Sequence, residues 1–101
     1  VLKANHMEKI EKIKKVKDSV EIFVNENVDS ISGFIIQSEL DHIVNTGTSI
    51  MCTKWNIGYE GGSFVQAVVN NDLSKAVGSA DGVNIKALKL YCLMMYNMTR
   101  V

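Results

Sequence analysis

The chain contains no proline among its 101 residues, and this absence removes the residue that most often breaks helices. Cysteine is scarce too, because Cys52 and Cys92 are the only two and lie far apart in apolar stretches. We interpret them as buried free thiols in a reducing compartment, with one disulfide as the alternative. Cys52 has no second Cys or His at zinc-binding spacing. The sequence therefore predicts neither a metal site nor a cofactor.

The chain also lacks the run of about 18 apolar residues that a membrane-spanning helix needs, and no secretion signal opens it. These absences favour an unsecreted, cytoplasmic protein with no membrane partner. The first six residues look vector-derived, because His6-Met7 resembles a cloning junction and Met7 a native start. The remaining residues, 7–101, are enough for a single domain only.

Arginine is almost absent, since Arg100 is the only one, and the charges are unevenly distributed. Six lysines fall within residues 1–18, whereas Lys54 is the only base in residues 19–72, which carry seven acidic residues. Such a chain is a poor match to duplex DNA, which normally requires several basic contacts on one face. Basic ends and an acidic middle would instead attract each other within or between chains.

The clearest pattern in the N-terminal half is helical. Apolar residues recur at steps of three and four from Ile10 to Val24, with lysines between them, which predicts an amphipathic helix that either ends near residues 25–27 or continues to about Gln37. The alternative is a short β-hairpin within residues 20–36, because Val20, Ile22 and Val24 alternate and residues 34–36 are rich in β-sheet formers.

The rest of the chain also favours helices. A short helix capped by Ser38 or Asp41 is expected to end at residues 45–47, and residues 56–62 are typical of a loop. Ser63 is expected to cap a helix that breaks near residues 70–72, resumes from Asp72 and ends at Gly78. Asp81 would cap a final helix from about residue 82 to residue 98. The predicted fold class is therefore mainly α, a small domain of about four helices.

The final helix carries little polar surface. A surface helix needs an apolar stripe only about 100° wide, but this helix has two adjoining apolar faces. If one face packs on the core, the other is left over for an interface. The residues expected at this interface are Leu90, Tyr91, Met94, Met95 and Met98. The alternative is that the helix is central and enclosed by the others.

A second group of residues suggests a small-ligand site. Two glycines before a helix present free backbone N–H groups that hold anions, and nearby aromatic rings offer a surface on which a base stacks. The spacing matches neither of the common nucleotide-binding motifs, so an ordinary helix start is the competing interpretation. The candidate residues are Trp55, Tyr59, Gly61, Gly62, Ser63 and Phe64.

One acidic and histidine cluster, made of Glu39, Asp41 and His42, carries the only enzymatic hypothesis. An imidazole beside carboxylates acts as an acid or base near neutral pH. Adjacent positions on a helix do not face each other, however. We therefore favour a solvated polar turn and a protein that is not an enzyme.

The last 40 or so residues resemble a pattern found in small proteins encoded by bacteriophages and prophages. The shared positions are Gly61-Gly62-Ser63-Phe64, Ala67-Val68, Asn71-Asp72-Leu73, Ala76, Ala80-Asp81, Asn84 and Tyr96-Asn97. This chain lacks the proline that the pattern usually has near its start and end. No activity is assigned to that family, so the resemblance implies an origin in the bacterial host cell more than a mechanism.

Given that origin, we expect a phage-type accessory protein that acts by binding a host protein, as a homo-oligomer. The alternative is a protein that sequesters a small, linear or cyclic nucleotide signal in anti-defence. A small enzyme that uses Glu39, Asp41 and His42 is the third hypothesis.

Overall fold

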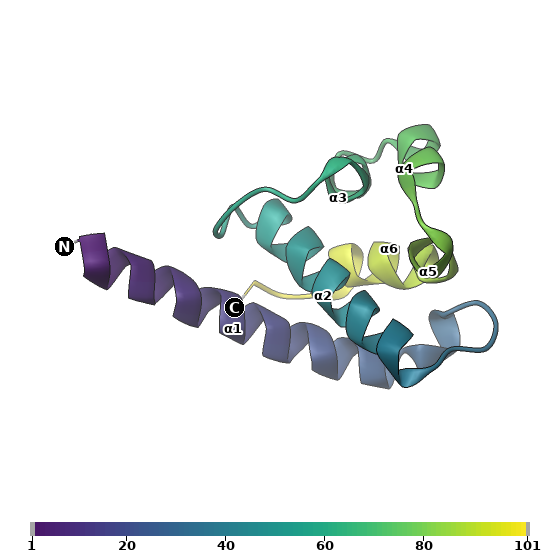
Figure 1. Ribbon diagram of the computed structural model, residues 1–101, viewed down its shortest axis with the longest axis horizontal. Coiled ribbons are helices and arrows are strands. Elements are labelled where there is room, and N and C mark those ends of the chain that lie inside the picture. Colours follow the sequence, from purple (N-terminus) through teal and green to yellow (C-terminus); the bar gives the residue numbers. More distant parts are fainter. Residues whose placement is uncertain (1, 101) are drawn as a thin grey trace.

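The computed structural model describes residues 2–100, with side chains from Met7 onward. This part of the chain is mainly helical and contains no strand (Figure 1), so the predicted fold class is confirmed. The α-helices are more numerous than the four expected: α1 (Leu2–Glu26), α2 (Gln37–Lys54), α3 (Ser63–Val69), α4 (Leu73–Ser79), α5 (Gly82–Lys86) and α6 (Leu88–Asn97).

The long helix α1 settles the question of residues 20–36. Val20 and Val24 are fully buried, whereas Ile22 between them is exposed. In a strand these three side chains would share one face, but on a helix only positions four apart do so. The alternative of a β-hairpin is therefore wrong. The helix ends at Glu26, as the break at residues 25–27 indicated, and one 3₁₀ turn, η1 (Val28–Ser30), follows it.

Helix α2 is longer than the sequence predicted. Residues 45–47 do not end it, and Gly47 lies buried in its interior. A Cβ atom at Gly47 would lie 3.0 Å from Val20 Cγ1 and 2.9 Å from Met94 Cε. Glycine at this position therefore lets α1 and α6 approach α2 closely rather than acting as a stop signal.

The predicted break near residues 70–72 is confirmed. Asn71 has a positive φ of 59°, and the Asp72 side chain accepts a hydrogen bond from Lys75 N at 3.2 Å as the cap of α4. Two details of this segment were wrong. Gly62 rather than Ser63 is the N-cap of α3, and α4 continues through Gly78 to Ser79.

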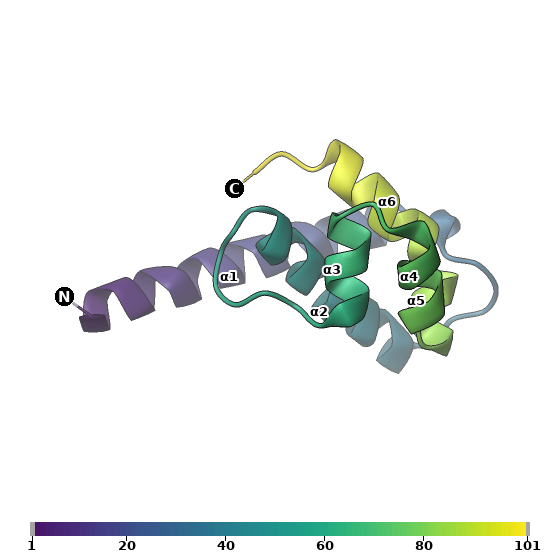
Figure 2. The same cartoon turned by 90° about the horizontal axis from the view of Figure 1, so that it is seen from above.

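The predicted final helix is divided in two. Asp81 caps α5 as expected, and Ala87, with φ −100° and ψ 6°, separates α5 from α6. Helices α1, α2 and α6 pack around one core, and α3 and α4 lie across α2 and α6 (Figures 1 and 2). The N-terminal turns of α1 project beyond this body. Within residues 2–100, no helix combines the length and apolar character that crossing a membrane requires.

Candidate functional site

The six residues of the predicted ligand site do not come together. Trp55 is only 7% exposed and belongs to the core, so its ring is not free to stack on a ligand. Tyr59 is 88% exposed and lies beneath Lys9, whose Nζ is 5.5 Å from the ring centroid. Of the six, only Gly62, Ser63 and Phe64 line a common depression. Trp55 and Tyr59 are not part of its lining.

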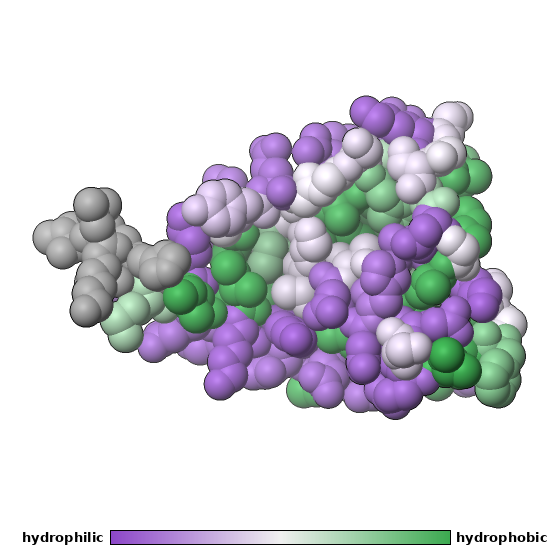
Figure 3. Space-filling model, in the orientation of Figure 1, coloured by the Kyte–Doolittle hydropathy of each residue, from purple (hydrophilic) through white to green (hydrophobic). Residues whose placement is uncertain are grey.

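This depression, which we call the polar groove, has a volume of about 470 Å³. In the view of Figure 3 the surface is hollowed between α2 and the α3–α4 pair. The groove is formed by α2, the start of α3, the end of α4, and α5. Its lining residues are His42, Asn45, Thr46, Ser49, Gly62, Ser63, Phe64, Val65, Ser79 and Asn84.

Gly61 fixes the loop at one end of the groove. A Cβ atom there would lie 2.6 Å from Ser49 Oγ and 2.5 Å from Val65 Cγ1, so only glycine allows the loop to lie this close to α2. The Gly61 backbone N–H donates to Thr53 Oγ1 at 3.0 Å, and Gln66 Nε2 donates to the Gly61 carbonyl at 2.7 Å. Gly61 thus positions the residues that follow it without lining the groove.

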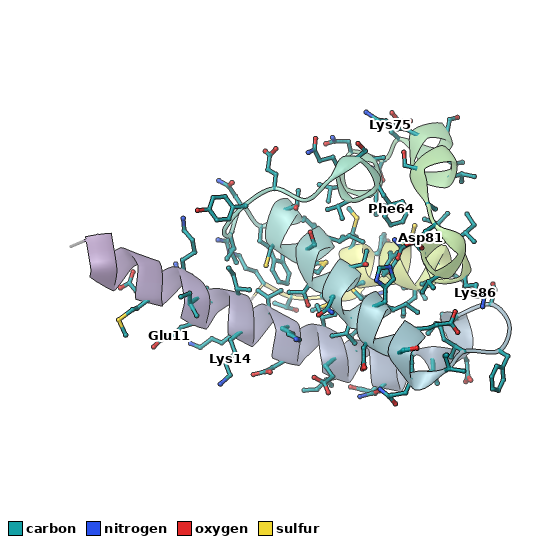
Figure 4. All side chains as sticks on the ribbon, in the orientation of Figure 1. Glu11, Lys14, Phe64, Lys75, Asp81 and Lys86 are labelled. Carbon is teal, nitrogen blue, oxygen red and sulfur yellow. The ribbon has the colours of Figure 1, made fainter. Side chains whose placement is uncertain are left out.

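The floor of the groove rests on a buried polar pair. The Tyr91 hydroxyl donates to Asn84 Oδ1 at 2.7 Å, and the Phe64 ring meets the Tyr91 ring edge-on with centroids 5.9 Å apart. Phe64 points from α3 into the body (Figure 4). Burial raises the pKa of Tyr91 above its ordinary value, so the phenol keeps the proton that it donates. The pair holds the Asn84 side chain in one orientation.

One rim of the groove carries a histidine–carboxylate contact that the sequence did not indicate. His42 Nε2 lies 3.2 Å from Asp81 Oδ2, and this contact joins α2 to the start of α5. Figure 4 labels Asp81. The other carboxylate oxygen, Oδ1, accepts from Asn84 N at 2.7 Å and from Val83 N at 3.1 Å. Hydrogen bonding from the Asn84 backbone N–H, with a smaller contribution from His42, lowers the pKa of Asp81.

The predicted cluster of Glu39, Asp41 and His42 is dispersed by these contacts. Glu39 lies 3.4 Å from Lys86 Nζ and accepts from the Ile36 backbone N–H, while Asp41 accepts from Gln37 Nε2 at 2.9 Å. Each of the three side chains therefore faces a different partner, because neighbouring helix positions point in different directions. Among the described residues, no group of three His, Cys, Asp or Glu side chains is arranged to hold a metal ion.

The five predicted interface residues do not form an exposed patch. Leu90, Tyr91 and Met94 are fully buried within this one chain, so their predicted exposure is wrong. Met95 and Met98 are half-buried and keep some surface. The error has a physical cause: the apolar pattern of α6 identifies two faces, but only packing against α1, α2 and α3 decides which one turns inward.

A different apolar surface lies over α3, α4 and α6, and we call it the apolar face. It consists of two adjoining grooves that share Val68, Asn71 and Cys92. Leu73 is 70% exposed and Tyr96 is 90% exposed on this surface. Its apolar members are Ala67, Val68, Val69, Leu73, Ala76, Leu88, Cys92, Met95 and Tyr96.

The sequence could have indicated this face, because Leu88, Cys92 and Tyr96 are spaced four apart on α6. Cys92 is exposed, so only Cys52 fulfils the expectation of a buried free thiol, and burial raises the Cys52 pKa. Comparison of the chain with protein-family models, curated proteins and solved structures finds no match. The resemblance to phage-encoded proteins therefore stays a prediction.

Proposed function

We propose that this chain is a non-enzymatic, phage-type accessory protein that binds a host protein through the apolar face. The observation that carries the proposal is the exposure of Leu73 and Tyr96 on two adjoining grooves. Apolar side chains gathered on one surface mark interaction sites more often than apolar residues scattered singly do. The three catalytic candidates, Glu39, Asp41 and His42, each contact a different partner, and this gives no comparable support to an enzyme.

The charges around the apolar face restrict the partner. Lys54 and Asp72 belong to its lining. Lys75 is exposed on α4 and Lys89 is exposed on α6, two of the helices that form the face. Three of these four residues are cations. We therefore propose that the partner presents an amphipathic segment whose apolar side chains are flanked by Asp or Glu, because complementary charges orient and select partners.

The test is a comparison of two variants with the wild-type protein. Leu73→Glu and Tyr96→Glu each place an anion on the apolar face, facing the proposed acidic partner, at a position exposed enough to leave the fold intact. Proteins retained from a bacterial lysate by the immobilised wild type are identified by mass spectrometry, and the leading partner is purified for calorimetry. We expect each variant to weaken its binding by about 2 kcal/mol or more, a factor of about thirty in Kd.

Phe34→Glu is the matched control, since Phe34 is a comparably exposed apolar residue that is not part of the apolar face. It should bind the partner like the wild type, and circular dichroism should show all three variants equally helical. Equal retention by both apolar-face variants, or no protein selectively retained by the wild type, would contradict the proposal.

Sequestration of a nucleotide is the second candidate function. Its support is that Gly62, Ser63 and Phe64 line the polar groove together. The lining contains neither Lys nor Arg, so a phosphate would be held by backbone N–H groups and hydroxyls alone. A nucleotide binder therefore ranks below a protein binder.

A further inference from the structure

The polar groove contains a hydrogen-bond donor that the fold itself does not use. Asn84 is only 7% exposed. Its Oδ1 accepts from Tyr91 and its backbone N–H donates to Asp81, but no hydrogen bond within the described residues uses its Nδ2. No side-chain nitrogen or oxygen among them is both fully buried and unpaired. Nδ2 must therefore reach the surface, and the surface that Asn84 lines is the polar groove.

The orientation of this amide is set before any ligand arrives. The Tyr91 hydroxyl holds Oδ1 at 2.7 Å, which turns the NH₂ group away from Tyr91. Tyr91 is itself fully buried and packed against Phe64, so the pair has little freedom to move. A donor fixed in this way costs little conformational entropy when a ligand binds it.

The charges of the lining indicate which ligands fit. None of its lining residues is Lys, Arg, Asp or Glu. The one titratable side chain in the lining, His42, is paired with the Asp81 carboxylate at the rim. The remaining polar groups are neutral: the hydroxyls of Thr46, Ser49, Ser63 and Ser79 and the amides of Asn45 and Asn84. Neutral donors and acceptors beside the Phe64 ring, with no cationic side chain in the lining to pair with a phosphate, favour an uncharged ligand.

We propose that the polar groove binds an uncharged ring compound that carries hydroxyl groups, with the Asn84 amide donating to one of its oxygen or nitrogen acceptors. A nucleoside and a small saccharide share this chemistry. The groove volume of about 470 Å³ lies within the range of about 300–1,000 Å³ that is usual for such ligands. The inference is independent of the proposed protein partner, because the polar groove and the apolar face have no lining residue in common.

The experiment is a titration followed by ¹H–¹⁵N NMR, which reports the Asn84 side-chain amide directly. The probes are adenosine and uridine in one arm, glucose and N-acetylglucosamine in a second, and AMP and UMP in a third. We expect the Asn84 amide signals to shift with one of the first two arms, and which arm does so identifies the ligand class. The phosphate of AMP or UMP should not strengthen binding over the matching nucleoside.

Ser79→Trp tests the location of the site, because Ser79 is an exposed residue at the rim and its replacement fills the groove without changing the Tyr91–Asn84 pair. Ser74→Trp is the matched control on the same helix, since Ser74 is exposed but does not line the groove. We expect Ser79→Trp to weaken binding about tenfold or more, equivalent to about 1.4 kcal/mol. Ser74→Trp should bind like the wild type.

Three results would overturn the inference. The first is an Asn84 amide that none of the four uncharged probes shifts at millimolar concentration. The second is unchanged affinity in Ser79→Trp. The third is a nucleotide that binds about tenfold tighter than its nucleoside, a gain of about 1.4 kcal/mol from the phosphate, which would show that the groove selects an anion.

Discussion

At the scale of single residues, two glycines within helices differ in how closely their surroundings are packed. Gly47 is buried where α1 and α6 cross α2, whereas nothing lies within 4 Å of a Cβ atom placed on Gly78 in α4. Glycine inside a helix costs about 0.5–1 kcal/mol relative to alanine because it loses more backbone freedom on folding. That cost is compensated by close packing at Gly47 only.

We therefore predict opposite effects for substitutions at these positions. Gly78→Ala should raise the free energy of unfolding by about 0.5–1 kcal/mol through helix propensity. Gly47→Val should lower it by about 1–3 kcal/mol, because its branched side chain overpacks the space beside Val20 and Met94. Urea titration followed by circular dichroism measures both. A Gly47→Val variant as stable as the wild type would show that the three helices separate at little cost.

At the scale of elements, the short helices α4 and α5 depend on their caps. Each begins at an aspartate whose carboxylate accepts backbone N–H bonds, Asp72 for α4 and Asp81 for α5. Helices this short are unstable alone, so the cap and tertiary packing must supply the stability that length does not. Asp81 makes one contact more than a cap, because its carboxylate also binds His42 on α2.

We predict that Asp81→Ala lowers the free energy of unfolding by about 0.5–2 kcal/mol at neutral pH, the usual cost of losing a cap. The pKa of Asp81 in the folded protein lies below its ordinary value of 3.8, mainly because the Asn84 N–H binds the ionised form. The ionised carboxylate therefore stabilises the fold fully above pH 3.8, and this contribution is lost as the pH falls through the folded-state pKa.

The difference in unfolding free energy between the wild type and Asp81→Ala should consequently shrink in acid. Asp81→Asn keeps an acceptor for the backbone and should be less destabilised than the alanine variant at neutral pH. Asp18→Ala is the control, since Asp18 is exposed on α1 and caps no helix. A difference that stays constant from neutral pH to pH 2 would argue against an ionised cap.

At the scale of the whole molecule, one chain encloses its own core and still leaves the apolar face uncovered. The homo-oligomer predicted from the sequence would have to bury this face, since Leu90, Tyr91 and Met94 are already inside the subunit. Self-association and capture of a host protein would then compete for the same side chains.

We predict that light scattering at micromolar concentration gives a molar mass above the 11.2 kDa of a single chain. Leu73→Lys should return the mass to that of the monomer, because it places a charge where an apolar contact is needed. Ile22→Lys, on an exposed position of α1, should not change the oligomeric state. A wild-type protein that is monomeric under these conditions would contradict the predicted homo-oligomer. The host protein would then be the only partner proposed for the apolar face.

The local sequence determined that the chain is helical and where several of the helices begin or end. The stripe from Ile10 to Val24, the end near residues 25–27, the break at residues 70–72 and the cap at Asp81 were all predictable, because propensity, capping and side-chain spacing act within a few residues.

Only the tertiary structure decided which side of α6 faces inward, that Gly47 is a packing site rather than a stop, and that His42 meets Asp81 across 39 positions of the chain. The polar groove was likewise beyond the sequence, and the spacing of Leu88, Cys92 and Tyr96 indicated only the α6 part of the apolar face. Both depend on contacts between helices distant in the chain, and the free energy of burying a side chain depends on what lies opposite it rather than on its sequence neighbours.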